Sequence, residues 1–261
     1  MDKVRIGLVG CGGMGTRHLY GLQELAQTPF NNVELCAVCD IRRENAELAA
    51  KEAERLLGTR PEIFTDLEKM VQTIPDLTAV DVVTDPSVHH QVVCQALDLG
   101  MHVMVEKPMA ITLEQCDDMI VAAAAYDVKL MIGYTQHFYG TSLKAKEILD
   151  SGELGPIITA VCYMSKNWSY KGRRPQYRSR YHGGGMWLTN GVHVVDRLTW
   201  IMASQAVSVS ASIGARAHYQ AGDDSATAFI RYKSGLAGVA VAVGYADGGP
   251  NYESVSYTHL T

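Results

Sequence analysis

The sequence predicts an α/β protein in which a doubly wound parallel sheet is followed by an α+β domain with a mainly antiparallel sheet. In the first half of the chain, short apolar runs rich in β-branched residues alternate with amphipathic helical stretches, and parallel strands need such helical crossovers. After about residue 135 the strands follow one another with few helices between them, which is typical of antiparallel pairing. We therefore expect one domain over residues 1–135 and a second over residues 136–261.

In the first domain each expected strand is a short apolar run. The expected strands are Val4–Val9, Val33–Cys39, Ile63–Phe64, Ala79–Val83, His102–Val105 and Lys129–Ile132. Between them, apolar residues recur at helical spacing. The expected helices are Met14–Leu25, Ile41–Leu57, a short helix that begins at Asp66, Val88–Leu99 and Leu113–Tyr126. Asp66 is a suitable N-cap, and Gly100 is a suitable residue just past a helix end.

The second domain begins with one helix and continues as strands. The helix is expected at Ser142–Leu149, and the strands at Ile157–Met164, Ala206–Ala217, Thr227–Tyr232 and Leu236–Val243. Ser234-Gly235 predicts a tight hairpin between the last two strands. The run Asp247–Pro250 breaks the last strand, and Tyr252–Thr261 is expected to follow without regular structure. Because Ser254–Thr261 resembles read-through of a sequencing adapter, we expect a truncated reading frame.

The composition is that of a folded globular protein. Hydrophobic residues make up 47% and charged residues 20% of the 261 positions. A net charge of −5 gives no general attraction for nucleic acid or for anionic membranes. No apolar run approaches the roughly 18 residues of a membrane span, and the N-terminus lacks the apolar stretch of a signal peptide. We expect a cytoplasmic protein with reduced thiols and no nucleic-acid or membrane partner.

The six cysteines form no disulfide framework in a chain of this length. Cys36 and Cys39 have C-x-x-C spacing, but they lie within one expected strand. Residues three apart on a strand point to opposite faces, so these two thiols are not expected to share a metal or a redox bridge. No other spacing is typical of metal ligands, and the sequence predicts no metal site.

The run Gly10-Cys11-Gly12-Gly13-Met14-Gly15 fits G-x-G-x-x-G between a strand and a helix. Gly10 permits the tight turn, Gly12 lets the backbone approach a pyrophosphate, and Gly15 allows the helix to pack on the sheet. The helix N-terminus, which includes Gly13 and Met14, presents N–H groups and a positive dipole end to that pyrophosphate. The alternative is a purely structural glycine-rich turn. In this context the motif predicts a dinucleotide-binding Rossmann domain.

An acidic residue follows the second strand at the position that such a domain requires. Asp40 lies 25 positions beyond Gly15, where a carboxylate accepts hydrogen bonds from the adenosine ribose and repels a 2′-phosphate. Arg42 and Arg43 come next and could instead pair with that phosphate. The sequence therefore favours NAD and leaves NADP open.

Further candidate cofactor contacts follow the strand Ala79–Val83. Thr84 and Pro86 lie at its carboxyl end, the edge of the sheet at which nucleotides bind. His89 opens the next helix and is counted with them, a structural role being the alternative.

Four segments together resemble the Gfo/Idh/MocA oxidoreductases, a family named for glucose–fructose oxidoreductase and inositol dehydrogenase. The resemblance runs from Ile6 to about Val243. The segments are Gly10–Gly15, Val82–His89, Glu106-Lys107-Pro108 and Gly183–Asp196. The Glu-Lys-Pro triplet is the most specific of them. The sequence departs from the family pattern at Asp85, where a proline is usual.

The resemblance implies that Lys107 lies in the active site, against the substrate hydroxyl and the nicotinamide ribose. An ammonium group there would stabilise a developing alkoxide. It further implies that Glu106 approaches the cofactor ribose and that Pro108 follows a cis bond. The alternatives are a solvated lysine and an acid paired with a neighbour.

The resemblance also implies that the segment Gly183–His193 contributes the second half of the active site. In the family a histidine here acts as acid and base, which transfers to His193, and an aspartate stands four residues before it. This chain has Thr189 in place of that aspartate, so a hydroxyl replaces a charge. Asn190 is adjacent, but it is expected on another face of the helix. The alternatives are a packed structural histidine and a threonine with no catalytic role.

The resemblance thus implies an NAD(P)-dependent oxidoreductase that transfers hydride between a nicotinamide and a secondary alcohol of a sugar, cyclitol or related polyol. Lys107, His193 and Thr189 are its candidate catalytic residues. A homodimer or homotetramer is expected for the full-length protein. Two alternatives stay open: a non-catalytic NAD(P)-binding regulatory protein, and an NAD-dependent glycoside hydrolase. Net redox turnover would distinguish the oxidoreductase from these two alternatives.

Overall fold

The computed structural model describes residues 3–168, 175–245 and 252–259. The chain divides into two compact units, Met1–Gly133 (unit 1) and Tyr134–Thr261 (unit 2). Among the helices of these residues, none has the length and apolarity that crossing a membrane requires.

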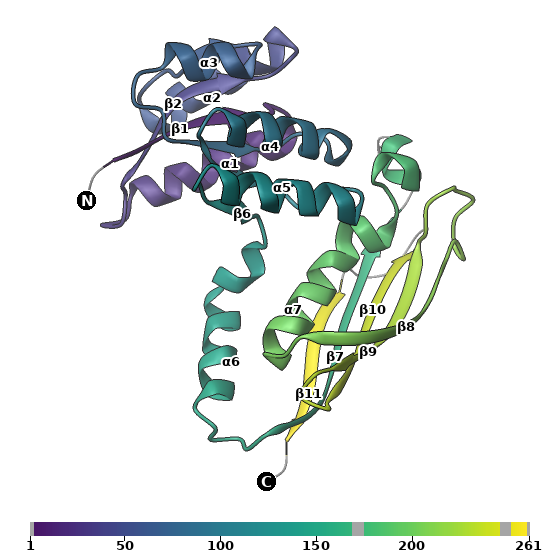
Figure 1. Ribbon diagram of the computed structural model, residues 1–261. Coiled ribbons are helices and arrows are strands. Elements are labelled where there is room, and N and C mark those ends of the chain that lie inside the picture. The colour runs from purple at the N-terminus through teal and green to yellow at the C-terminus, as the bar shows by residue number, and fades with distance from the viewer. Residues whose placement is uncertain (1–2, 169–174, 246–251, 260–261) are drawn as a thin grey trace. The chain divides into compact units, whose positions relative to one another are not determined.

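Unit 1 is built on a six-stranded sheet in the order β3-β2-β1-β4-β5-β6, and every pair of neighbours is parallel (Figure 1). The strands are β1 (Val4–Val9), β2 (Val33–Cys39), β3 (Glu62–Phe64), β4 (Ala79–Val82), β5 (His102–Val105) and β6 (Leu130–Ile132). The order reverses at β1, which has β2 on one side and β4 on the other. Ligands of such sheets bind beyond the carboxyl ends of the strands at this switch point. The predicted doubly wound sheet is confirmed.

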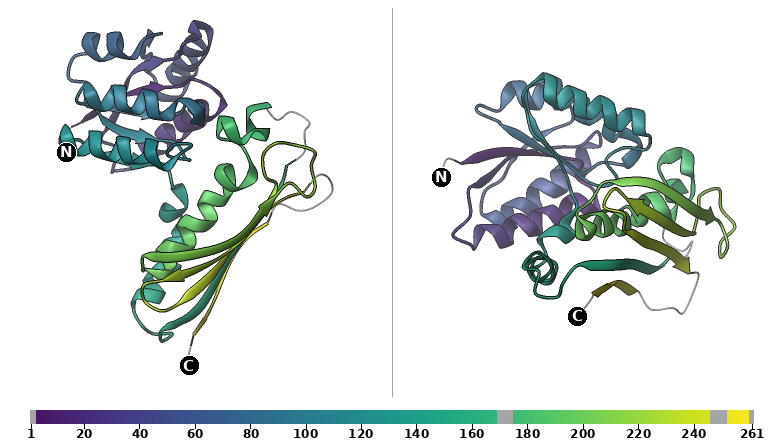
Figure 2. Two further views of the ribbon diagram at one scale, coloured as in Figure 1. Left: turned by 45° about the vertical axis from the view of Figure 1, so that its right-hand side comes forward. Right: turned by 60° about the horizontal axis from the view of Figure 1, so that its bottom comes forward.

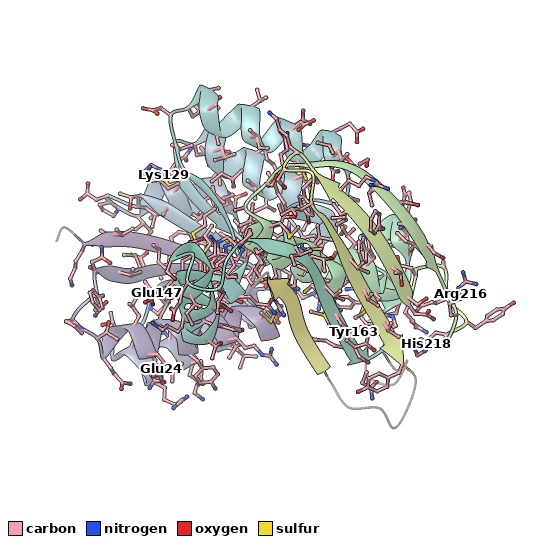
Figure 3. The ribbon with its side chains drawn as sticks, turned by 90° about the horizontal axis from the view of Figure 1, so that it is seen from below. Glu24, Lys129, Glu147, Tyr163, Arg216 and His218 are labelled. Atoms are coloured by element: carbon pink, nitrogen blue, oxygen red, sulfur yellow. The ribbon has the colours of Figure 1, made fainter. Side chains whose placement is uncertain are left out.

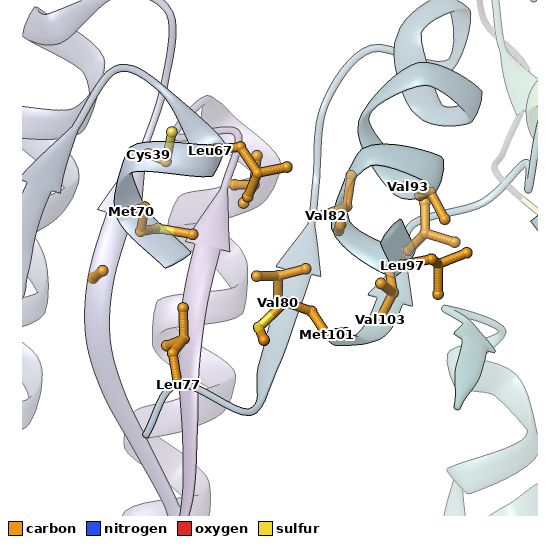
Figure 4. Close-up of a cluster of buried hydrophobic side chains, with 14 of the residues drawn as sticks. Cys39, Leu67, Met70, Leu77, Val80, Val82, Val93, Leu97, Met101 and Val103 are labelled. Atoms are coloured by element: carbon orange, nitrogen blue, oxygen red, sulfur yellow. The ribbon is translucent and has the colours of Figure 1, made fainter. Parts of the chain in front are cut away.

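Helices cover both faces of this sheet. They are α1 (Gly13–Ala26), α2 (Arg43–Leu57), α3 (Leu67–Thr73), α4 (His89–Asp98) and α5 (Leu113–Ala125), with a 3-10 turn η1 (Pro86–Val88) before α4. On one face α1 and α2 enclose a core that includes Leu8, Leu19 and Val38. On the other, α3, α4 and α5 cover the larger cluster shown in Figure 4. With apolar side chains buried on both faces, the central strands read as continuous apolar runs.

Strand β2 departs from regular alternation. Its pairing with β1 shifts by one residue, because Ile6 lies opposite Leu35 and Gly7 lies opposite Ala37, which leaves Cys36 as a bulge. Cys36 therefore packs against the same core cluster that contains Cys39. The expectation that these two thiols point to opposite faces is wrong, since it assumed an unbroken strand.

Unit 2 contains a five-stranded sheet in the order β11-β7-β10-β9-β8. The strands are β7 (Ile157–Asn167), β8 (Ala206–Gly214), β9 (Ser225–Tyr232), β10 (Ala237–Tyr245) and β11 (Tyr252–His259). β7 and β10 pair in parallel and the other neighbours antiparallel, so the sheet is mixed and mainly antiparallel. Gly235 takes a φ of 86° in the predicted hairpin between β9 and β10.

One face of the second sheet is covered by helix α7 (Val192–Met202), which Figure 2 shows lying along it. Their shared core includes Met164, Leu198 and Ile230. The remaining elements are α6 (Gly140–Asp150), the 3-10 turns η2 (Thr135–Phe138), η3 (Pro175–Arg178) and η4 (Arg180–His182), and the π-helical turn η5 (Trp187–Gly191).

Two expectations about the strands of unit 2 are wrong. β8 ends at Gly214 and not at Ala217, because the Asp224 carboxylate accepts the N–H groups of Arg216, Ala217 and His218 and turns the chain there. Arg216 and His218 are labelled in Figure 3. The segment Tyr252–His259 is a strand and pairs antiparallel with β7. A strand edge presents unpaired backbone groups, and this segment satisfies those of β7.

Candidate functional site

The glycine loop lies at the carboxyl end of β1 and has no room for side chains at two positions. Gly10 has a φ of 98°, and a Cβ there would lie 2.5 Å from the Val83 carbonyl oxygen. A Cβ on Gly15 would lie 2.3 Å from the carbonyl oxygen of Gly10. Gly13 differs, since a Cβ would meet nothing within 4 Å. The loop is therefore packed tightly against the residues that follow β4 on one side and open on the other.

The open side exposes the N-terminus of helix α1. Gly12 is the N-cap, and no side chain in the described part of the chain caps it, whereas Asp66 caps α3 and Thr112 caps α5. Met14, in the first turn, is 41% exposed. The Thr84 hydroxyl, which follows β4, is buried without a hydrogen-bond partner among the described residues. Uncapped N–H donors and an unsatisfied hydroxyl fit the pyrophosphate-binding end of a dinucleotide.

Alanine at Gly15 is expected to destabilise unit 1 by about 1–3 kcal/mol, because the new methyl group has to displace backbone. NADH binding should weaken with it. Gly21 lies in the same helix with nothing within 4 Å of a Cβ, so alanine there should be neutral or stabilise by up to about 1 kcal/mol. Urea unfolding and NADH titration of both variants test this pair. Equal effects at the two positions would contradict the packing role of Gly15.

Asp40 joins the glycine loop to helix α2. Its Oδ2 accepts the N–H of Cys11 at 2.9 Å, and its Oδ1 accepts the N–H of Arg42 at 2.9 Å and the Asn45 amide at 3.2 Å. Since a carboxylate oxygen accepts two hydrogen bonds, Oδ2 keeps capacity for one ribose hydroxyl. Arg42 is exposed beside it. Arg43, the other candidate for a 2′-phosphate, pairs with Glu47 at 2.9 Å.

The Glu-Lys-Pro triplet directly follows β5. The Lys107–Pro108 bond is cis, as the resemblance implied. Glu106 is buried, and its Oε2 accepts the N–H of Lys107 at 3.0 Å. Lys107 itself is half-buried. The carboxylate of Glu106 therefore holds the backbone from which the Lys107 side chain starts.

His89 differs from the expectation that it contacts the cofactor. Its side chain is fully buried, with Nδ1 2.8 Å from the carbonyl oxygen of Pro108 and Nε2 3.2 Å from that of Thr84. Burial lowers the pKa of this imidazole, which favours the neutral form. His89 supports the Lys107 turn and the end of β4, and this is the structural alternative considered above.

His18 and Asp81 were missed by the sequence reasoning. His18, on α1, places Nδ1 2.7 Å from Asp81 Oδ2 and Nε2 3.3 Å from Glu106 Oε1. Burial alone would lower its pKa, but hydrogen bonds to the two carboxylates raise the pKa of His18 to about 10. The sequence does contain one indication of this contact, because Asp81 is an acidic residue within the apolar run of β4.

In unit 2 the three glycines precede the turn that carries Thr189. Gly185 has a φ of 100°, and a Cβ there would lie 2.5 Å from Asp223 Oδ1. Asp223, also missed from the sequence, accepts the N–H of Trp187 at 2.7 Å through Oδ2 and that of Met186 at 2.8 Å through its backbone oxygen. Asp223 therefore fixes the start of the helical segment that leads to His193.

This segment is not the regular α-helix that was expected. Trp187–Gly191 forms a π-helical turn, and the α-helix begins only at Val192. Thr189 is buried in the wider turn. His193 lies in the first turn of α7, with its ring 6.1 Å from that of Tyr134 and perpendicular to it. Single π-helical turns are frequent at functional sites.

Polar contacts connect helix α7 to the 3-10 turn η2 at the start of unit 2. His137 Nε2 lies 2.7 Å from Asp196 Oδ2, and the His137 ring stacks on Trp200 at 4.5 Å. Arg197 donates to the buried Gln136 amide oxygen at 2.7 Å. Asp196 thus has a structural contact one turn beyond His193. In the described residues, no three His, Cys, Asp or Glu side chains form a group suited to a metal ion.

Comparison with known families accounts for most of the chain. Residues 4–134 match an oxidoreductase family model described as an NAD-binding Rossmann fold, and residues 142–257 match the GFO/IDH/MocA C-terminal domain. The predicted NAD-binding Rossmann domain is confirmed.

Several curated relatives are dehydrogenases. Myo-inositol 2-dehydrogenase of Thermotoga maritima is 27% identical over 246 residues, or 90% of this chain and 67% of the relative. Glucose-6-phosphate 3-dehydrogenase of Bacillus subtilis is 26% identical over 79% of this chain and 56% of the relative. A 1-carboxy-3-chloro-3,4-dihydroxycyclohexa-1,5-diene dehydrogenase of Comamonas testosteroni is 29% identical over 70% and 46%. The chain spans about half to two thirds of the length of these relatives.

Solved structures share the fold. Scyllo-inositol dehydrogenase from Lactobacillus casei, solved with NAD(H) and scyllo-inositol, superposes with a TM-score of 0.82 at 23% identity, over 99% of this chain and 74% of that one. GenD2 from gentamicin A biosynthesis, in complex with NAD, gives 0.85 at 21% identity, over 99% and 70%. These matches confirm the predicted combination of a parallel Rossmann sheet and a mainly antiparallel second sheet.

Proposed function

Because the chain belongs to the Gfo/Idh/MocA family of oxidoreductases, we propose that it transfers hydride between a nicotinamide cofactor and a secondary alcohol of a sugar, cyclitol or related polyol. The observation that carries the proposal is the edge of the unit 1 sheet. There the glycine loop after β1, Thr84 after β4 and Lys107 after β5 follow neighbouring strands. The named substrates of the relatives, inositol and glucose 6-phosphate among them, support a polyol or sugar.

The cofactor-binding residues of the proposal are those of the sheet edge. The N–H groups at the start of α1 hold the pyrophosphate, and Oδ2 of Asp40 accepts a ribose hydroxyl. When bound, the nicotinamide supplies the hydride exchange. Thr84, Pro86 and Glu106 belong to the same edge, with Glu106 acting through the Lys107 backbone.

In this proposal three side chains act on the substrate alcohol. The Lys107 ammonium donates a hydrogen bond to the substrate hydroxyl oxygen and stabilises negative charge as it develops there. The imidazole of His193 takes the hydroxyl proton in oxidation and returns it in reduction. Thr189 offers a hydroxyl that orients the substrate without adding charge. Its presence in place of the aspartate leaves His193 without a charged neighbour at that position.

Titration with NADH and with NADPH, followed by nicotinamide fluorescence, tests the cofactor half of the proposal. A screen of polyols and sugars for NADH formation then tests the chemistry. Saturable NADH binding with turnover of a polyol is expected. Binding without net redox turnover would favour a regulatory protein, or a glycoside hydrolase if a glycoside is cleaved. A cooperatively folded protein that binds neither cofactor would contradict the proposal.

Replacing Asp40 with alanine is expected to weaken NADH binding by about 10- to 100-fold, the usual effect of one or two charged hydrogen bonds. NADPH binding should weaken less, because the repulsion of a 2′-phosphate disappears and Arg42 remains. Asp66→Ala is the matched control, since it also removes a carboxylate that accepts a backbone N–H, in this case that of Lys69 in α3. An unchanged ratio of the two dissociation constants in Asp40→Ala would exclude Asp40 from cofactor selection.

A further inference from the structure

We propose that His18 is a positioning residue for Lys107: its imidazole bridges two buried carboxylates, one of which holds the Lys107 backbone. The inference rests on the proposed function of Lys107. His18 comes three residues after the last glycine of the loop, one turn along helix α1. It connects the helix that presents its N-terminus to the cofactor with the turn that presents the lysine.

The first contact fixes the ring. Asp81 belongs to the central strand β4 and is 5% exposed, so its carboxylate has little freedom. Its Oδ2 lies 2.7 Å from His18 Nδ1, the shorter of the two imidazole contacts. A short contact to a rigid partner determines where the opposite ring nitrogen points.

The second contact fixes Glu106. His18 Nε2 lies 3.3 Å from Oε1, while Oε2 of the same carboxylate accepts the Lys107 N–H at 3.0 Å. Glu106 thus links an imidazole on α1 to a backbone amide beyond β5. Each carboxylate oxygen has its own donor, so the side chain has one preferred orientation.

Charge explains why a histidine suits this place. Asp81 and Glu106 are both buried acids, and an imidazolium between them compensates charge that is costly to bury alone. Without it, the cation nearest along the chain to Glu106 is the ammonium of Lys107. We expect the carboxylate then to attract that ammonium, which would draw the lysine away from a substrate hydroxyl. His18 therefore limits the attraction of Glu106 for the Lys107 ammonium.

Two substitutions separate the contacts. In His18→Asn the amide nitrogen occupies the place of Nδ1, which keeps the contact with Asp81 and loses the contact with Glu106. In His18→Gln it occupies the place of Nε2, which keeps a donor for Glu106. Lysine labelled with ¹³C at Cε reports the Lys107 environment by NMR, and Lys107→Arg assigns its resonance. His90→Asn is the control, since it removes a histidine–aspartate contact of 3.1 Å to Asp118 on the surface of unit 1.

We expect the Lys107 resonance to move most in His18→Asn, which loses both the charge and the donor to Glu106. It should move less in His18→Gln, which loses the charge but keeps that donor, and stay in place in His90→Asn. With a substrate in hand, kcat should fall by about 10- to 100-fold in His18→Asn, as for a small misplacement of a reacting group, and recover at least in part in His18→Gln. A resonance that is unchanged in His18→Asn, or that moves equally in both His18 variants, would overturn the proposal.

Should His18→Asn fail to fold, Asp81→Asn tests the same chain of contacts from its other end. It keeps the imidazole but loosens its orientation, and an unchanged Lys107 resonance would again overturn the proposal. The NMR result needs no substrate. A shifted resonance in a protein without polyol turnover would therefore uphold the positioning of Lys107 and reject the proposed reaction.

Discussion

Lys107→Ala is expected to lower kcat by about 100- to 1000-fold, the usual loss when one donor to a developing oxyanion is removed. The dissociation constant of NADH should change by less than about threefold, which is under 1 kcal/mol. The reason is that different groups at the sheet edge bind the cofactor and the substrate. The pyrophosphate meets the backbone of the glycine loop, whereas the Lys107 side chain serves the substrate hydroxyl.

Stopped-flow measurement of hydride transfer, together with NADH titration of the same preparation, separates these two effects. Lys129→Ala is the matched control, because Lys129 is an exposed lysine that directly precedes β6 in the same unit. It should leave both quantities unchanged. If Lys107→Ala weakened NADH binding as much as it slowed turnover, Lys107 would be a cofactor-binding residue and the proposed oxyanion role would be wrong.

The architecture of unit 1 was predictable because its signals are local. β1, the glycine turn and α1 are encoded within Val4–Ala26, where an apolar run meets a motif with a known backbone geometry. Asp40 and the Glu-Lys-Pro triplet follow their strands directly, so their place at the carboxyl edge followed from the parallel topology. Roles for Lys107 and His193 came from resemblance to a family.

Contacts between distant residues were not predictable in the same way. His18 meets Asp81 and Glu106 across 63 and 88 positions, and periodicity does not specify such pairings. Asp223 meets Trp187 across 36 positions for the same reason. The π-helical turn at Thr189 was missed because helical spacing was taken as uniform, and β11 because the break at Asp247–Pro250 was taken as the end of the sheet.

The buried charges of unit 1 predict how stability depends on pH, through His18→Leu. The leucine leaves Asp81 and Glu106 without the imidazolium, and breaking such a buried arrangement typically costs about 3 kcal/mol in the free energy of unfolding. In the folded protein the pKa of His18 is raised to about 10 from 6.5. The stabilisation is therefore complete below about pH 6.5 and is lost as the pH rises through about 10.

Glu106 sets the acidic limit of the pH range in which this arrangement stabilises the protein. Burial would raise its pKa, but His18 and Lys107 hold the pKa of this carboxyl below its ordinary value of 4.5. Its contribution is therefore complete above about pH 4.5 and is lost as the pH falls through the lowered pKa. The difference in stability between wild type and His18→Leu should accordingly be largest between about pH 4.5 and 6.5 and shrink towards pH 10.

Urea unfolding followed by far-UV circular dichroism at a series of pH values measures this difference. Tryptophan fluorescence records unit 2 separately, because all three tryptophans, Trp168, Trp187 and Trp200, belong to it. Groups whose pKa is the same in both proteins cancel in the comparison, and His90→Leu should show no such trend, since its partner Asp118 is exposed. A difference that stays constant or grows between pH 6.5 and 10 would mean that His18 is neutral in the folded protein. Glu106 would then depend on Lys107 alone for its compensating charge.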